Sequence, residues 1–190
     1  MARPSIATER RAQIIDATMS TIAEHGIRGT TLDRIADAVG MSRGHVRHFV
    51  GNRDRLLLDT AIAVFADDTG TVGSILPSGT RDIEDALDYL FGPEFNSPDR
   101  ENAVVLGLVD LSRTTPAIAE VLTTAYGATR EQLASLIAEA KPDASTDACT
   151  TAAYGLLTSA LGSVFLSDFD GDPTRLRRTR AAAEAQLSIL

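Results

Sequence analysis

"TTLDRIADAVGMSRGHVRHFVGNRDRLL", residues 30–57, holds two short apolar-periodic segments separated by a glycine and a serine. In the first segment, apolar side chains recur at helical spacing until Gly40 supplies a stop. Ser42 is a favourable N-cap for a second helix that begins only two residues later. Because the connection is so short, the two helices must cross steeply. This stretch therefore predicts a helix-turn-helix.

The spacing of small and apolar residues supports this interpretation. A steep crossing requires a small residue where the helices touch, here Ala36, and a residue tolerant of positive φ in the turn, here Gly40. The apolar residues that would close the shared core are Ile35, Val39, Met41, Val46 and Phe49. A lone A-x-x-x-G is common, so the complete pattern carries the prediction. A purely structural helical hairpin is the alternative.

Further helices are expected on both sides of this motif. Residues 8–25 are predicted as a helix that Gly26 ends. Thr30 and Asp33 are expected to form a capping box at the start of the next helix, and another helix follows over residues 53–68.

The rest of the chain is expected to be helical throughout, which predicts the all-α fold class. A loop rich in glycine, serine and threonine is expected at residues 70–79. The helices expected after it are residues 80–91, 101–112, 117–140, 146–169 and 173–190.

Charge is distributed unevenly along the chain. Residues 1–55 carry nine arginines against six acidic residues, a net charge of +3, and they hold all three histidines. Residues 56–190 carry nine basic and twenty acidic residues, a net charge of −11, which gives −8 for the whole chain. A basic module on an acidic body favours local polyanion binding, because the acidic remainder repels phosphates at long range. Solvated surface without a ligand is the alternative.

The helix that follows Ser42 has the residue types of a DNA-reading helix. The planar fork of Arg43 matches the two acceptors of guanine, an interaction worth roughly 1–3 kcal/mol of discrimination. Gly44 would let the backbone approach the groove wall, and free N–H groups at helix N-termini would hold phosphates. The alternative for Arg43 and Arg47 is that they are solvated surface residues that do not contact DNA. The DNA-binding residues expected on these grounds are Thr30, Thr31, Ser42, Arg43, Gly44, His45, Arg47 and His48.

Residues 30–57, preceded by the helix at 8–25, resemble the DNA-binding module of the TetR (tetracycline-repressor-like) family. Motif-level similarity covers about the first third of the chain, whereas only length and helical character agree beyond it. The resemblance implies an N-terminal three-helix helix-turn-helix DNA-binding domain at residues 1–55 and a C-terminal helical effector-binding and dimerisation domain at residues 56–190.

Two arginines of the module acquire expected roles from this resemblance. The family's basic residue at the position of Arg53 contacts phosphate, so the same contact is expected here. Pairing with a neighbouring acid, Asp54 or Asp59, is the alternative for Arg53. Many members carry tyrosine where Arg47 stands, so this chain lacks a tyrosine–phosphate contact, and Arg47 is a candidate to replace it.

The resemblance also implies a small-molecule pocket in the body of the chain. Asp110 would hold a cationic or hydrogen-bonding ligand if it faces inward, although an acid at such a position more often faces water. The alternative for the tyrosines is that they pack within the protein and do not contact a ligand. The candidate ligand-binding residues are Phe65, Tyr89, Leu106, Asp110, Tyr126, Leu157 and Phe165.

The last two predicted helices are candidates for dimerisation. Residues 153–165 combine a wide apolar face with a second face of small residues, and small residues permit close helix approach. The resemblance implies that this helix pair meets its twin in a four-helix bundle, whereas packing within one chain is the alternative. The candidate dimerisation residues are Gly155, Ser159, Gly162, Leu176, Ala183 and Leu187.

The residue pattern speaks against catalysis, cofactors and metal. The only lysine, Lys141, precedes a proline, so the chain has no G-x-x-x-x-G-K-[ST] phosphate loop. Cys149 has no disulfide partner and is expected to be a buried thiol, with a redox sensor as the alternative. His45 and His48 have the spacing of two metal ligands but no further ligand nearby. Because no membrane span or signal peptide is evident, a cytoplasmic protein is expected.

Together with the resemblance, the sequence predicts a ligand-responsive transcriptional regulator, and repression is its expected direction of regulation. It would bind a near-palindromic double-stranded DNA operator as a homodimer, and a small-molecule effector would release it. The alternative is an acidic helical interaction protein whose N-terminal module docks a protein partner.

Overall fold

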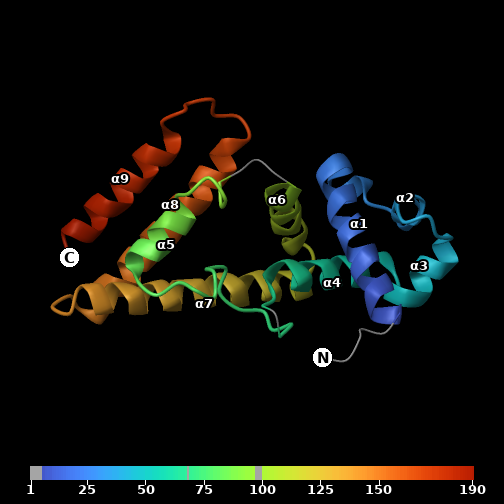
Figure 1. Cartoon of the computed structure of the whole chain (residues 1–190), viewed down its shortest axis with the longest axis horizontal. Helices are drawn as coiled ribbons and strands as arrows, with labels where there is room; N and C mark the ends of the chain where they lie inside the picture. Colours follow the sequence, from blue (N-terminus) through green and yellow to red (C-terminus); the bar gives the residue numbers. More distant parts are fainter. Residues whose placement is uncertain (1–5, 68, 97–99) are drawn as a thin grey trace. The chain divides into compact units, whose positions relative to one another are not determined.

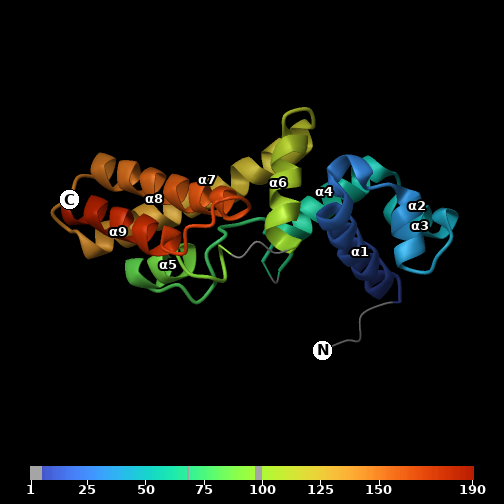
Figure 2. The ribbon, with the colours of Figure 1, turned by 90° about the horizontal axis from the view of Figure 1, so that it is seen from above.

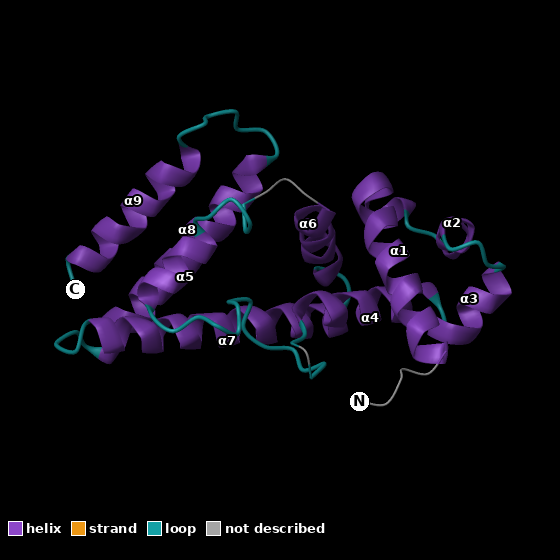
Figure 3. Ribbon diagram, viewed as in Figure 1, coloured by secondary structure: helices purple, strands orange, loops and turns teal. Residues whose placement is uncertain are grey.

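The computed structural model describes residues 6–67, 69–96 and 100–190, and within them regular secondary structure is entirely helical (Figure 3). The all-α prediction is therefore confirmed. The helices are α1 (Ile6–Gly29), α2 (Leu32–Ala38), α3 (Arg43–Val50), α4 (Arg53–Phe65), α5 (Ile83–Leu90), α6 (Arg100–Ser112), α7 (Pro116–Ala140), α8 (Thr146–Ser167) and α9 (Arg175–Ser188).

The chain divides into two compact units. The first unit comprises residues 1–72 and 99–122, and the second comprises residues 73–98 and 123–190. The first unit thus contains α6 as well as α1 to α4. These units are defined by contacts within the chain. The predicted boundary between a DNA-binding domain and an effector domain, at residues 55 and 56, is a functional one and stays a prediction.

One apolar cluster of the first unit is shared by α1 to α4, which Figure 1 colours from blue to teal. Val46 and Ile35 are fully buried, as expected for the shared core, and Val50 joins them from the end of α3. Phe49 lies half-buried at the edge of the cluster. The buried members are Ile14, Leu32, Ile35, Ala36, Val46, Val50 and Leu56.

The turn between α2 and α3 has the expected geometry. Gly40 adopts φ 64°, a left-handed conformation that favours glycine, and the N–H of Met41 donates to the carbonyl of Ala36 at 2.9 Å. The hydroxyl of Ser42 then caps α3 by accepting from the N–H of His45 at 3.2 Å. The helix-turn-helix prediction therefore holds in its backbone details.

The start of α2 corrects the expected capping box. The cap is Thr31, whose hydroxyl accepts from the N–H of Arg34 at 3.3 Å. Thr30 is fully buried, and its hydroxyl donates to the carbonyl of Gly26 at 2.9 Å. The reason is that α1 continues past its break at Gly26 (φ 67°, ψ 172°) to Gly29, which places Thr30 against the end of α1.

Helix α6 packs closely on α1 within the first unit. A Cβ atom added at Gly107 would lie 3.3 Å from Cγ2 of Ile22 and 3.4 Å from Cδ1 of Ile27. An ion pair between Arg100 and Asp16, at 2.7 Å, joins the same two helices. Glycine at position 107 therefore sets the close approach of the two helices.

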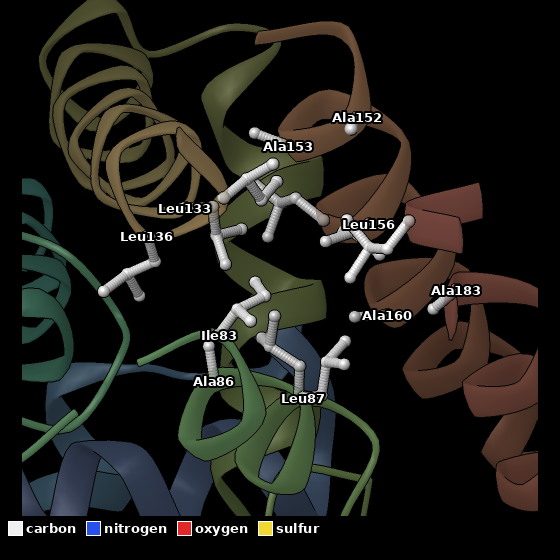
Figure 4. Close-up of a cluster of buried hydrophobic side chains, with 14 of the residues drawn as sticks. Ile83, Ala86, Leu87, Leu133, Leu136, Ala152, Ala153, Leu156, Ala160 and Ala183 are labelled. Carbon is white, nitrogen blue, oxygen red and sulfur yellow. The ribbon is translucent and has the colours of Figure 1, made fainter. Parts of the chain in front are cut away.

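The second unit has its own core, formed by α5, the larger part of α7, α8 and α9. In Figure 4, Leu87 of α5, Leu133 of α7 and Leu156 of α8 point toward one another, and all three are fully buried. Small residues, among them Ala183, let α9 lie along α8, as the ribbon in Figure 2 shows. Cys149 is buried in this core, as expected for a packed thiol.

A threonine of α7 holds the segment that leads into α5. The hydroxyl of Thr129, fully buried, accepts from the N–H of Ile75 at 3.0 Å and donates to the carbonyl of Ala125 at 2.8 Å. Pro77 follows this tether at an exposed turn, where the N–H of Thr80 donates back to its carbonyl at 3.0 Å. The chain is thus anchored first and then turns through solvent.

Among the described helices, α8 alone is long and apolar enough to cross a membrane. Its most apolar window has a mean hydropathy of 1.4, and 44% of that window is buried inside the protein. Its buried residues, including Leu156 and Ala160, belong to the core of the second unit. This burial is typical of a core helix.

Candidate nucleic-acid interface

Helix α3 presents a continuous polar surface to solvent. Its inner side is formed by Val46 and Val50 with Phe49 half-buried beside them, and its other residues are exposed. Six residues named above for DNA binding lie together here, and we refer to them as the α3 surface: Ser42, Arg43, Gly44, His45, Arg47 and His48, all exposed.

Neighbouring side chains support two parts of the α3 surface. Arg43 donates to the carboxylate of Asp33 on α2 at 3.0 Å, while about 60% of each side chain remains exposed (62% and 61%). Phe49 lies beside both imidazoles, with ring centroids 6.0 Å from His45 and 5.4 Å from His48. The guanidinium and the imidazoles are thus held at the surface with access to a partner.

Three helix N-termini belong to the same module. Their caps are Thr31, Ser42 and Asn52, and each cap side chain accepts from the backbone N–H three residues ahead. The remaining N–H groups of a first turn carry partial positive charge, which makes a helix N-terminus suited to phosphate. Thr30 does not share this role through its side chain, because that side chain is buried and hydrogen-bonded.

Arg53 has its hydrogen-bond partners within the module, and its expected phosphate contact stays a prediction. Its Nε donates to the carbonyl of Thr30 at 2.6 Å, and its Nη2 donates to the carbonyl of Ile27. The third nitrogen, Nη1, lies 3.8 Å from the carboxylate of Asp54. The guanidinium is therefore directed toward the end of α1.

Asp59 is a buried acid that sequence reasoning did not single out as a structural residue. It is 6% exposed and receives Arg11 of α1 at 2.6 Å and Arg55 of α4 at 3.1 Å. Because both arginines are themselves about half exposed (45% and 60%), solvent screening limits what each pair contributes. Its position on the buried side of α4 was the available signal, since a buried acid requires a partner.

The candidate ligand-binding residues do not all come together. Leu157 is buried in the core of the second unit, and Tyr89 and Tyr126 pack against it. Burial raises the pKa of Tyr126 to about 12, so its phenol remains protonated at neutral pH. Phe165 belongs to this unit but is 56% exposed.

The other three ligand candidates lie in the first unit. Asp110 is exposed, which agrees with the alternative that it faces water. Phe65 is buried and Leu106 is half-buried. Tyr89, Tyr126 and Leu157 are thus the ligand candidates that share the core of the second unit.

The dimerisation candidates separate into two sets. Ala183 and Leu187 are buried in the core of their own chain, and a Cβ atom at Gly155 would lie 2.5 Å from Nε2 of Gln186. These residues serve the contact between α8 and α9, which agrees with the alternative of packing within one chain. Gly162 is exposed, and Ser159 and Leu176 are half-buried.

An aromatic surface near these residues was missed in the sequence. Tyr154, Phe165 and Phe169, which we call the α8 aromatic stripe, are 58%, 56% and 66% exposed. Phe165 and Phe169 meet edge to face at 5.3 Å between ring centroids, and the guanidinium of Arg130 lies 5.3 Å from the ring of Tyr154. The spacing of eleven residues between Tyr154 and Phe165 was the available signal, because it places them on one face of α8, and Phe169 follows in the turn after Ser167.

These features define a class of protein, the helix-turn-helix DNA-binding regulators. Residues 14–60 match the family model described as "Bacterial regulatory proteins, tetR family". The HTH-type transcriptional regulator BetI of Paraburkholderia xenovorans (strain LB400) is 47% identical over 58 residues, which are 30% of this chain and 30% of that protein. The match thus spans less than a third of the length of these curated relatives.

Solved structures extend the likeness to the whole fold. A TetR transcription regulator from Haloarcula marismortui ATCC 43049 has a TM-score of 0.74 at 21% identity, over 96% of this chain and 98% of that chain. A protein from Saccharomonospora viridis, solved in complex with choline, has a TM-score of 0.74 at 17% identity, over 95% and 96%. Residues 14–60 are thus similar to the DNA-binding module of the TetR family, and the likeness to the solved structures shows that the fold of the whole chain is shared with theirs.

Proposed function

We propose that the protein is a ligand-responsive transcriptional repressor that binds a near-palindromic operator as a homodimer in the cytoplasm. The observation that carries this proposal is the α3 surface, where two arginines and two histidines are exposed to solvent. The helix that holds them is anchored on its other side in the apolar cluster of α1 to α4. Arg43 reads a guanine edge, Arg47 contacts phosphate or base, and Gly44 permits close approach to the groove. The N-termini capped by Thr31 and Ser42 hold phosphates.

The second copy is expected to cover the α8 aromatic stripe. Three aromatic side chains that are each more than half exposed, two on α8 and one in the turn that follows it, form an unusual apolar feature beside a helix whose opposite side is core. A twofold axis along α8 and α9 would pair this stripe with itself, with Gly162 permitting close approach. The two recognition helices α3 would then face successive major grooves, roughly 34–36 Å apart.

The effector is expected to bind in the second unit. Tyr89, Tyr126 and Leu157 bring aromatic, apolar and hydroxyl groups to the core of this unit, a combination typical of small-molecule sites. The choline-bound neighbour supports the view that this fold accommodates a small molecule. Effector binding would favour a conformation in which the two α3 helices no longer match successive grooves.

Selection from random duplexes tests the DNA-binding part. The full-length protein is expected to enrich a near-palindrome, whereas an Arg43→Ala variant retains phosphate contacts and loses preference at one base pair of each half-site, by roughly 1–3 kcal/mol. Arg177→Ala, an exposed arginine of the second unit, is the matched control. Failure to enrich any sequence would favour the protein-docking alternative.

Sedimentation velocity tests the dimer. Phe165→Glu places a charge in the stripe and is expected to give monomers, whereas Ser135→Glu adds the same charge at an exposed position of α7 and leaves the dimer intact. A monomeric wild-type protein would refute the dimer.

Operator titration at fixed salt tests the response to ligand. A compound that raises the melting temperature of the free protein, with choline as the first probe, is expected to weaken operator binding. An identified ligand that leaves operator affinity unchanged would refute the coupling.

A further inference from the structure

An ion pair joins the two helices of the helix-turn-helix. Nη1 of Arg43, the first residue of α3, donates to Oδ2 of Asp33, in the first turn of α2, at 3.0 Å. We infer that Asp33 is a positioning residue, which holds the guanidinium of Arg43 in the orientation that reads guanine. This inference rests on the proposed function, because Arg43 is the base-reading residue of that proposal.

Helix α3 itself gives the side chain of Arg43 no comparable support. The N-terminal end of a helix dipole is positive and does not attract a cation. Gly44 has no side chain, and Arg47, four residues after Arg43, carries the same charge, which is unfavourable at this spacing. Residues 43–50, all of which the structure describes, include no acidic residue. The orientation of the guanidinium is therefore set from α2.

The hydrogen bond to Asp33 leaves one edge of the guanidinium free. Nε and Nη2 lie on that edge, and they have no hydrogen-bond partner among the residues that the structure describes. Two parallel N–H donors match N7 and O6 of guanine. The side chain of Arg43 is 62% exposed, so this edge is open to a base while Nη1 stays bonded to Asp33. A side chain that is held beforehand loses less entropy on binding.

The carboxylate of Asp33 has a second effect, which is to weaken binding to DNA of any sequence. Its side chain is 61% exposed, and a negative charge beside the groove repels phosphates. Because both partners are exposed, the ion pair contributes little to folding. The contribution of Asp33 is therefore to selectivity: it orients Arg43 for guanine and weakens binding that depends on phosphate contacts alone.

Binding to the selected operator, and to operators altered at the base pair whose preference is lost in Arg43→Ala, tests this role. Asp33→Ala is expected to lower the preference for guanine about threefold, within the range measured for exposed ion pairs, and to tighten binding to random duplexes at low salt. Asp33→Asn keeps an oxygen that accepts from Nη1 and loses the charge. It is expected to bind random duplexes like Asp33→Ala and to retain the guanine preference.

Asp37→Ala is the matched control, because it removes an exposed acid of α2 four residues after Asp33. Its guanine preference is expected to equal that of the wild type. An unchanged preference in Asp33→Ala overturns the inference, since charge repulsion alone changes the affinity for all duplexes equally.

A double-mutant cycle separates positioning from a direct contact between Asp33 and a base. When Arg43 is already alanine, Asp33→Ala is expected to cause no further loss of preference at that base pair, because Asp33 acts through Arg43. An equal loss in both backgrounds overturns the inference and would indicate that the carboxylate itself accepts from a base.

NMR of the free full-length protein distinguishes failure of this inference from failure of the proposed function. Rotation of the Arg43 guanidinium about its Nε–Cζ bond is expected to be slower than that of Arg47, for which the described residues provide no ion pair, and to become faster in Asp33→Ala. A wild-type protein that selects no sequence refutes the proposed function and this inference with it. A protein that selects a guanine-containing palindrome, but whose Arg43 rotates equally fast with and without Asp33, overturns the inference alone.

Discussion

Replacing Gly40 by alanine is expected to destabilise the first unit, whereas replacing Gly44 by alanine, four residues later, is expected to stabilise it. Neither new methyl group meets a close neighbour, since no atom lies within 4 Å of a Cβ at Gly40 and only Oγ of Ser42 lies at 4.0 Å from one at Gly44. Steric clashes with the surroundings therefore do not decide whether each substitution raises or lowers the free energy of unfolding. The backbone does, because Gly40 has φ 64° and Gly44 lies in the first turn of α3.

The magnitudes follow from these conformations. A non-glycine residue in the left-handed region costs roughly 1–2 kcal/mol. The reduced entropy of the unfolded chain offsets roughly 0.4–1 kcal/mol of this. The net effect of Gly40→Ala is a loss of about 1 kcal/mol. Gly44→Ala gains the helix propensity of alanine, about 0.5 kcal/mol at this position near the helix end.

Urea unfolding of the full-length variants measures both effects, followed through the amide signals of Ile35 and Val46 so that the first unit is observed by itself. The midpoint is expected to fall for Gly40→Ala and to rise for Gly44→Ala, at unchanged slope. Shifts of the same sign in both variants would falsify the assignment of these effects to backbone conformation. Operator binding gives an independent contrast, since Gly44→Ala is expected to weaken affinity despite its gain in stability.

Three further outcomes are expected. Ile35→Ala empties a fully buried site and is expected to cost about 2–5 kcal/mol in urea unfolding, and a loss below that range would mean that the cluster refills the space. Asn52→Ala removes the cap that accepts from Arg55 at 2.8 Å and is expected to cost about 1 kcal/mol, while Asn52→Asp, which keeps an acceptor, retains stability. Hydrogen bonds from the side chain and backbone of Arg81 lower the pKa of Asp85 below 3.8, so its stabilisation of α5 is present above that pH and is lost as the pH falls through the lowered value. Carboxyl NMR titration is expected to show this low midpoint and a rise in Arg81→Met; an unchanged midpoint would exclude the side-chain hydrogen bond as its cause.

The fold was predictable wherever local signals agreed with packing. Gly40 and Ser42 specify their turn and cap by chemistry that acts within a few residues, and Val46 follows from helical spacing. The cap of α2 was displaced by one residue because Thr30 and Thr31 are chemically equivalent in the sequence. Only the extra turn of α1 beyond Gly26 decides which of the two threonines is buried.

The candidate site was predictable where it depends on one helix. The exposure of Arg43, Arg47 and the histidines follows from the periodicity of α3 alone. The hydrogen-bond partners of Arg53 lie 23 and 26 residues away in sequence, so spacing within its own helix carries no information about them. Asp110 illustrates the same limit, because whether a helical acid faces water or the interior depends on what packs against α6.

The hydroxyl of Thr129 bears on how far this protein tolerates added sequence. That hydroxyl holds Ile75 to α7, so a change in the exposed turn that begins at Pro77 is not expected to displace the chain before it. After the turn, the next residue of the second unit's core is Ile83. Extra residues between Ser78 and Gly79 would enlarge a loop whose closure entropy grows by only about 0.6 kcal/mol per doubling of length. That turn is therefore a suitable insertion point for a fluorescent or affinity tag, and a position at which evolution could lengthen the chain without disturbing the DNA-binding module.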